Sequence, residues 1–132
     1  MTVNTFEDKS DKSFESAELL VKNSHKNSSI HSYYYSCFQL LNHFLIVHCR
    51  FTERDIKEFS RTKESHNDVI SEVKKKLDEE EVNYIKLFSE LNLIKKERVK
   101  ADYGMAFVTD TEDTKKKTMF FREQFKSLIN DI

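Results

Sequence analysis

Hydrophobic side chains recur along this 132-residue chain at the three- and four-residue spacing of α-helices. The clearest run shares one helical face and consists of Ile30, Tyr34, Cys37, Phe38, Leu41, Phe44 and Leu45. Between Tyr33 and Phe51 the sequence is apolar nearly all round the helix, which is typical of an element surrounded by neighbours. The pattern therefore predicts a central helix that begins near Ile30, after a polar cluster at residues 23–29.

Other segments show the same periodicity and predict helices over residues 5–23, 65–77, 78–104 and 109–132. Capping-box-like sequences mark the starts at Thr5, Ser65 and Thr109, and Asp78 with Glu81 marks the fourth. Residues 52–64 are dense in charge and are interpreted as a connector with at most a short helical piece. The count is five helices, one of them short.

Short polar links make helices that follow one another in sequence pack side by side. The chain is therefore predicted to be a single domain over residues 1–132, an all-α up-and-down bundle of four to five helices. With 38% apolar residues, including 11 Phe and 5 Tyr, it can build a substantial core.

Glycine and proline are nearly absent, with one glycine and no proline where average usage is about 7% and 5%. Turn-rich β folds, glycine-rich phosphate loops and dinucleotide fingerprints all need glycines that this sequence lacks. The single glycine, Gly104, follows a predicted helix, where a residue with positive φ would end it. We therefore expect a positive φ at Gly104.

The charges nearly cancel, with 22 Lys and Arg against 23 Asp and Glu, so bulk charge favours neither nucleic acid nor membrane. The start of the sequence has no apolar signal core, and the most apolar stretch is too polar to span a bilayer, so we expect a cytoplasmic protein. No metal-ligand spacing is found, and no metal or cofactor is predicted. His43 and His48 lie about 140° apart around a helix and are interpreted as core or interface histidines.

Arg61 and His66, separated by four residues, are the one local arrangement that suggests chemistry. A metal-independent ribonuclease needs an imidazole to move a proton and a fixed cation to stabilise charge on the scissile phosphate. His66 would stand at the first helical position if Ser65 is the cap, where free amides favour an anion. On spacing alone, a surface arginine and a capping histidine explain the pair more often.

Three segments together resemble the HEPN family (higher eukaryotes and prokaryotes nucleotide-binding) in its small stand-alone prokaryotic form. They are HSYYYSCF at residues 31–38, SHNDVIS at residues 65–71 and RVKADYG at residues 98–104. The resemblance implies an all-α bundle that is frequently a homodimer and is commonly encoded beside a minimal nucleotidyltransferase in toxin–antitoxin or defence modules.

Many members of the wider family are ribonucleases whose motif is an arginine followed, after four to six residues, by a histidine. Arg61 and His66 match its ends, while Thr62 stands where a polar Asn, Asp or His is usual. In members silenced by a nucleotidyltransferase, a tyrosine two residues after the histidine accepts the nucleotide, and here that position is Asp68. Stand-alone members often keep the histidine and lack the arginine.

Geometry adds a constraint on Arg61 and His66, because they would point about 140° apart if residues 61–66 were all helical. Catalysis would then need a loop at Arg61 or a cleft between two copies of the chain. Aromatic residues that lie off the main stripes offer weak support for self-association, with core packing as the alternative. They are Tyr33, Tyr35, Phe51, Phe107 and Phe120.

Arg98, Asp102 and Tyr103 are candidates to line the groove of His66 and bind nucleotide or RNA. In the alternative reading, Arg98 and Asp102 pair at a helix end and Tyr103 packs over it. The leading hypothesis is a homodimeric HEPN-type ribonuclease with His66 and Arg61 as catalytic residues. The alternatives are a noncatalytic module that binds nucleotide or docks a nucleotidyltransferase, and a purely structural interaction protein.

Overall fold

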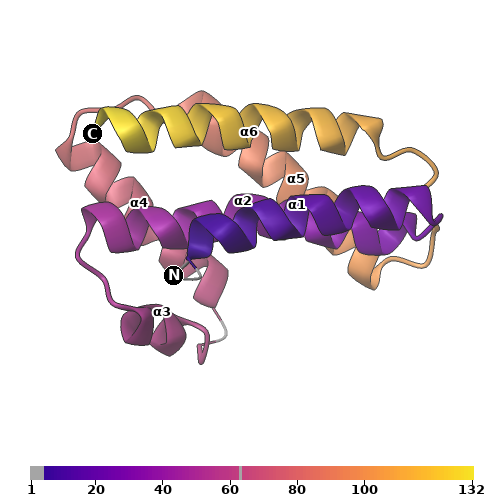
Figure 1. Ribbon diagram of the computed structural model, residues 1–132, viewed down its shortest axis with the longest axis horizontal. Helices are drawn as coiled ribbons and strands as arrows, with labels where there is room; N and C mark the ends of the chain where they lie inside the picture. Colours follow the sequence, from indigo (N-terminus) through magenta and orange to yellow (C-terminus); the bar gives the residue numbers. More distant parts are fainter. Residues whose placement is uncertain (1–4, 63) are drawn as a thin grey trace.

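The computed structural model describes residues 5–62 and 64–132, and across these ranges it is all-helical (Figure 1). Its six helices are α1 (Phe6–Lys22), α2 (Lys26–His48), α3 (Glu53–Phe59), α4 (Ser65–Glu79), α5 (Ile85–Tyr103) and α6 (Glu112–Asp131). The predicted all-α bundle is confirmed, with one helix more than the sequence indicated. None of the described helices has the length and apolarity needed to cross a membrane.

The central helix of the bundle is α2, which packs against α1, α4, α5 and α6. Figure 1 shows α1 and α2 as an antiparallel hairpin along the long axis of the molecule, with α6 running lengthwise above them in this view. Every residue of the predicted apolar stripe of this helix, from Ile30 to Leu45, is at most 8% exposed. Because neighbours surround α2, its apolar residues extend around the helix, as the sequence predicted.

An aromatic cluster joins α2, α5 and α6. The ring of Phe125 lies 5.6 Å from that of Phe44 and stacks on Phe121 at 5.3 Å, and Phe88 meets Phe121 edge-on at 6.2 Å. Buried aromatic pairs of this kind add about 0.5–1.5 kcal/mol each beyond the area that they bury. The cluster therefore fixes the two C-terminal helices on the central one.

Residues 52–62 agree with the interpretation as a connector with a short helical piece, and that piece is α3. Thr52 and Asp55 form a capping box, in which each side chain accepts a hydrogen bond from the other residue's backbone N–H. Ile56 is 8% exposed and anchors the short helix to the core. In Figure 1, α3 lies beside the bundle axis, at the end where α2 stops.

The boundaries of α4 differ from the prediction at both ends. Glu64 is the N-cap and makes no side-chain capping bond, so Ser65 and His66 are the first two helical residues and the predicted cap at Ser65 is wrong. Asp78 does not start a new helix, because α4 continues through it to Glu79. The chain turns at Glu81, which has a φ of 56°, and α5 begins only at Ile85.

The expected positive φ at Gly104 is wrong, since its φ is −78° and its ψ is 159°. The left-handed residues are instead Ser24, Arg50 and Glu81, and each of them lies just after a helix. Glycine is required at 104 for a different reason. A Cβ there would lie 2.5 Å from the Lys100 carbonyl oxygen, which accepts the Gly104 N–H at 2.8 Å.

Gly104→Val should therefore destabilise the protein by about 1–3 kcal/mol, the usual cost of forcing atoms into occupied space. Ala106→Val, in the exposed segment that follows, is a control that places valine where no such contact exists. Urea unfolding of both variants measures the effect. Equal free energies of unfolding for the two variants would show that the close approach at Lys100 is unimportant.

Candidate functional site

His66 and Arg61 lie in different environments. His66, in the first turn of α4, is half-buried, and its ring packs 4.3 Å from the ring of Phe38. The Arg61 side chain is 65% exposed after α3 and pairs with Glu58 at 3.2 Å. The described contacts of Arg61 do not include His66, so a single chain does not bring the predicted catalytic pair together.

Two tyrosines of α2 hold the imidazole of His66. The Tyr34 hydroxyl lies 3.1 Å from Nδ1, and the Tyr35 hydroxyl lies 3.4 Å from Nε2. In a neutral imidazole, one nitrogen carries the proton and donates it, while the other accepts, so the two tyrosines take opposite roles. Tyr34 is fully buried and needs this partner, whereas the longer contact between Nε2 and the Tyr35 hydroxyl is the one that a ligand replaces more readily.

Positive charge reaches His66 from α5. The Arg98 guanidinium lies 5.2 Å from the ring centre of Tyr34, and its side chain is only 13% exposed. The Lys95 ammonium donates to the Asn67 amide oxygen at 2.9 Å. His66, Lys95 and Arg98 line one pocket of about 280 Å³, which we call the Arg98 pocket.

Two cations, Lys95 and Arg98, line the Arg98 pocket against one carboxylate, that of Glu64. Burial, followed by the charges of Arg98 and Lys95, lowers the pKa of His66 to about 4. Burial and Arg98 also lower the pKa of Lys95. The Nε of Arg98 is buried and has no hydrogen-bond partner among residues 5–62 and 64–132. An anion in the pocket would favour the charged forms of Lys95 and Arg98.

Of the other candidates, Arg98 lines the pocket, whereas Asp102 and Tyr103 are not among its lining residues. Asp102 accepts a hydrogen bond from Arg98 at 3.4 Å and lies 2.9 Å from Nδ1 of His31. The predicted pairing of Arg98 with Asp102 at a helix end is therefore confirmed. Tyr103 is 77% exposed, so the expectation that it packs over this end is wrong.

Tyr34, Tyr35 and Lys95 lie around His66 but were not predicted from the sequence to belong to the site. A signal was present, because Tyr34 and Tyr35 belong to one of the three resembling segments and Lys95 precedes Arg98 by one helical turn. Periodicity nevertheless marked Tyr34 only as a core residue. Its hydroxyl acquires a function because α4 brings His66 against it.

His43 and His48, two of the three histidines of α2, have the structural roles that were predicted. His43 faces α1, where Nε2 lies 3.3 Å from Glu7, and His48 faces α6, where Nε2 lies 2.7 Å from the Ile129 carbonyl oxygen. In the described part of the chain, no group of three or more His, Cys, Asp or Glu side chains is placed to hold a metal ion.

The off-stripe aromatics do not form one exposed patch. Tyr33 is buried, while Tyr35, Phe51 and Phe120 are half-buried and pack against the core. Phe107 alone is largely exposed, at 88%. Four of the five therefore pack in the core, which was the alternative to a contact patch for self-association.

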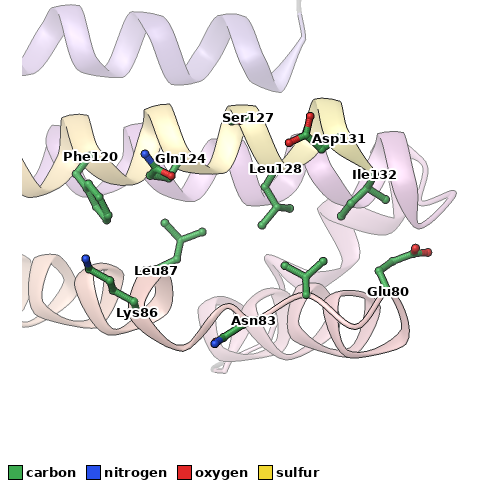
Figure 2. Close-up of a pocket in the computed structure, with 11 residues that line it drawn as sticks. Glu80, Asn83, Lys86, Leu87, Phe120, Gln124, Ser127, Leu128, Asp131 and Ile132 are labelled. Carbon is green, nitrogen blue, oxygen red and sulfur yellow. The ribbon is translucent and has the colours of Figure 1, made fainter.

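The close-up in Figure 2 shows a separate cavity of about 510 Å³, with Phe120 of α6 and Lys86 of α5 on opposite walls. It contains no histidine, and its charged lining residues are Glu80, Lys86 and Asp131. It lacks both the imidazole and the buried arginine of the Arg98 pocket, so it offers no comparable chemistry.

Comparison of the chain with protein family models, with curated proteins and with solved structures found no match in any of the three. The geometry and charge of the Arg98 pocket are therefore the basis for the proposed function.

The lowered pKa of His66 predicts a pH-dependent stability. The unfolded chain binds a proton at this imidazole with an ordinary pKa near 6.5, the folded chain only near 4, so stability is complete above pH 6.5 and falls as the pH drops towards 4. Between pH 7 and 5 the wild type should lose about 1 kcal/mol more than His66→Gln, after allowance for solvent screening of the half-exposed ring.

Urea unfolding at both pH values measures this difference in free energy. The same substitution at the exposed His25 controls for the loss of an imidazole as such. An identical change between pH 7 and 5 in the wild type and in His66→Gln would contradict the assigned environment of His66.

Proposed function

We propose that the protein binds the phosphodiester backbone of RNA at the Arg98 pocket and cleaves it without a metal ion, as a HEPN-type ribonuclease. The observation that carries the proposal is the convergence of a tyrosine-held imidazole, a buried arginine and a lysine on one small pocket. Proton transfer and charge stabilisation are the two requirements of metal-independent RNA cleavage, and His66 and Arg98 supply one each.

In this mechanism the ribose 2′-oxygen attacks phosphorus, and the bond from phosphorus to the 5′-oxygen breaks. His66 Nε2 takes the proton of the 2′-hydroxyl, and the leaving 5′-oxygen takes a proton from water. The products are a 2′,3′-cyclic phosphate and a 5′-hydroxyl. Because its pKa is about 4, His66 is neutral at pH 7 and able to accept, and the bound phosphate raises its basicity by favouring the imidazolium.

Arg98 is the proposed phosphate-stabilising cation, the role that was expected for Arg61. Its guanidinium is held against the Tyr34 ring, near the same imidazole, whereas Arg61 is exposed and bound to Glu58. In a homodimer of the kind that the family resemblance implies, Arg61 of a second copy would still be free to approach the phosphate. The two arginines therefore make separable contributions that mutation can distinguish.

The second candidate is a noncatalytic module that binds a nucleotide phosphate, or that docks a partner nucleotidyltransferase through this end of the bundle. A specific observation favours nucleotide binding, since both nitrogens of His66 are engaged by tyrosines and its pKa of about 4 makes it a weak base. In this role Lys95 and Arg98 hold the phosphate and no bond is broken.

The ribonuclease proposal predicts that the purified protein cleaves single-stranded RNA in the presence of a metal chelator. His66→Ala and Arg98→Gln should each lower the rate by at least about 100-fold, the usual effect of losing a general base or an electrostatic contact to the transition state. Gel analysis of a labelled RNA, with mapping of a cyclic phosphate at the new 3′ end, measures both rate and chemistry.

Arg61→Ala serves as the matched comparison for Arg98→Gln. A full loss of cleavage in Arg61→Ala with normal activity in Arg98→Gln would restore the original pair and reject Arg98. Binding of RNA without cleavage, lost in Arg98→Gln, would favour the noncatalytic module. If neither binding nor cleavage is detected, the site has no role in RNA chemistry.

A further inference from the structure

Two larger cavities adjoin the Arg98 pocket, one on each side. The first, the α2–α3 cavity, has a volume of about 570 Å³ and shares Tyr35, Ser65 and His66 with the pocket. The second, the Tyr84 cavity, has a volume of about 480 Å³ and shares Asn67 and Lys95 with it. The shared residues place the three hollows next to one another around the N-terminal half of α4.

Aromatic rings and side-chain amides line the α2–α3 cavity. Phe38 and Phe59 contribute flat apolar surface, and Gln39 and Asn42 contribute amides. Asn42 donates to the Gln39 amide oxygen at 3.0 Å, while its own Oδ1 is buried without a hydrogen-bond partner in the described part of the chain. Asn42 is 4% exposed, so this unused acceptor lies in a region where an unmet hydrogen bond is costly.

The Tyr84 cavity repeats this chemistry on the other side of the cationic pocket. Tyr84 and Phe88 provide its aromatic rings, which meet edge-on at 5.5 Å. The Lys74 ammonium lies 5.9 Å from the Tyr84 ring centre and 5.5 Å from that of Phe88. Asn67 and Asn92 add amide groups to the lining.

Along the surface, the two outer cavities carry aromatic rings together with lysines, and the Arg98 pocket between them holds His66, Lys95 and Arg98. A dinucleotide unit has the matching order of base, phosphate and base. Nucleobases stack on aromatic side chains and hydrogen-bond to amides through their edges, whereas the phosphate needs cations. Both cavities fall in the range of about 300–1,000 Å³ that is usual for small-molecule sites.

We infer that the α2–α3 cavity and the Tyr84 cavity are two nucleobase subsites that flank the scissile phosphate, so that the minimal ligand is a dinucleotide unit. This inference rests on the proposed function, because it takes the Arg98 pocket as the phosphate site. His66 lies where the first base subsite meets the phosphate site, which is where the ribose between base and phosphate would be.

The test measures the affinity for a fluorescein-labelled tetraadenylate in which fluorine replaces each 2′-hydroxyl, so that the oligomer cannot be cleaved by 2′-oxygen attack. A second probe has the same backbone and no bases. Phe59→Leu and Tyr84→Leu each remove one flat ring while keeping apolar volume. Phe120→Leu, in the separate cavity of Figure 2, is the matched control.

The inference predicts that Phe59→Leu and Tyr84→Leu each weaken binding of the tetraadenylate by at least about fivefold, from the loss of one stacking contact. Phe120→Leu should bind as the wild type does. The wild type should bind the abasic oligomer at least about fivefold more weakly than the tetraadenylate, a comparison that requires no substitution to fold.

Three other outcomes distinguish a failure of the base subsites from a failure of the phosphate site. Equal affinity for both probes, or normal binding in either Phe59→Leu or Tyr84→Leu, overturns the base subsites and leaves the phosphate site standing, provided that Arg98→Gln still weakens both probes. Unchanged binding in Arg98→Gln overturns the phosphate site and with it this inference. If neither probe binds, both the phosphate site and the base subsites are rejected.

Discussion

The structure depends on the burial of α2 over residues 29–45, beyond which Ile46 and Val47 are exposed. A helix surrounded by neighbours also buries its polar atoms, and each of these needs a partner. The Tyr33 hydroxyl donates to Glu18 of α1 at 2.8 Å, the Tyr34 hydroxyl meets His66 of α4, and His48 meets a carbonyl oxygen of α6. Apolar packing places the outer helices around α2, and these polar contacts set their register along it.

The candidate site is a consequence of that register. The side chains of Tyr34 and Tyr35 extend from α2 towards α4 and α5. The buried Tyr34 hydroxyl therefore finds its hydrogen-bond partner in the imidazole of His66, at the start of α4. The same tyrosine ring supports the Arg98 guanidinium from α5. One side chain of the central helix thereby holds the proposed proton-transfer group and the proposed phosphate ligand, which explains how a small bundle without a glycine-rich loop can present a preorganised anion site.

The sequence predicted the parts of the fold that follow from periodicity. The burial of Phe38, Leu41 and Phe44 on one face of α2 was predicted, because the spacing of apolar residues indicates directly which face of a helix packs against the core. The short helix α3 was foreseen only as a possible short helical piece without bounds, because seven residues with one buried side chain carry almost no periodic signal. The start of α2 was placed too late, because Asn27 is helical and binds the Ala101 carbonyl oxygen and the Val108 N–H, contacts that no local pattern encodes.

For the candidate site, the sequence alone determined His66 and Arg98 as residues worth testing, through residue chemistry and the three resembling segments. It also determined that the chain is helical, since one glycine and no proline leave few other folds. Only the tertiary structure decided which arginine approaches the imidazole. Spacing along the chain favoured Arg61, but the distance between side chains depends on helix packing, and α5 lies against α2 while Arg61 projects into solvent beyond α3.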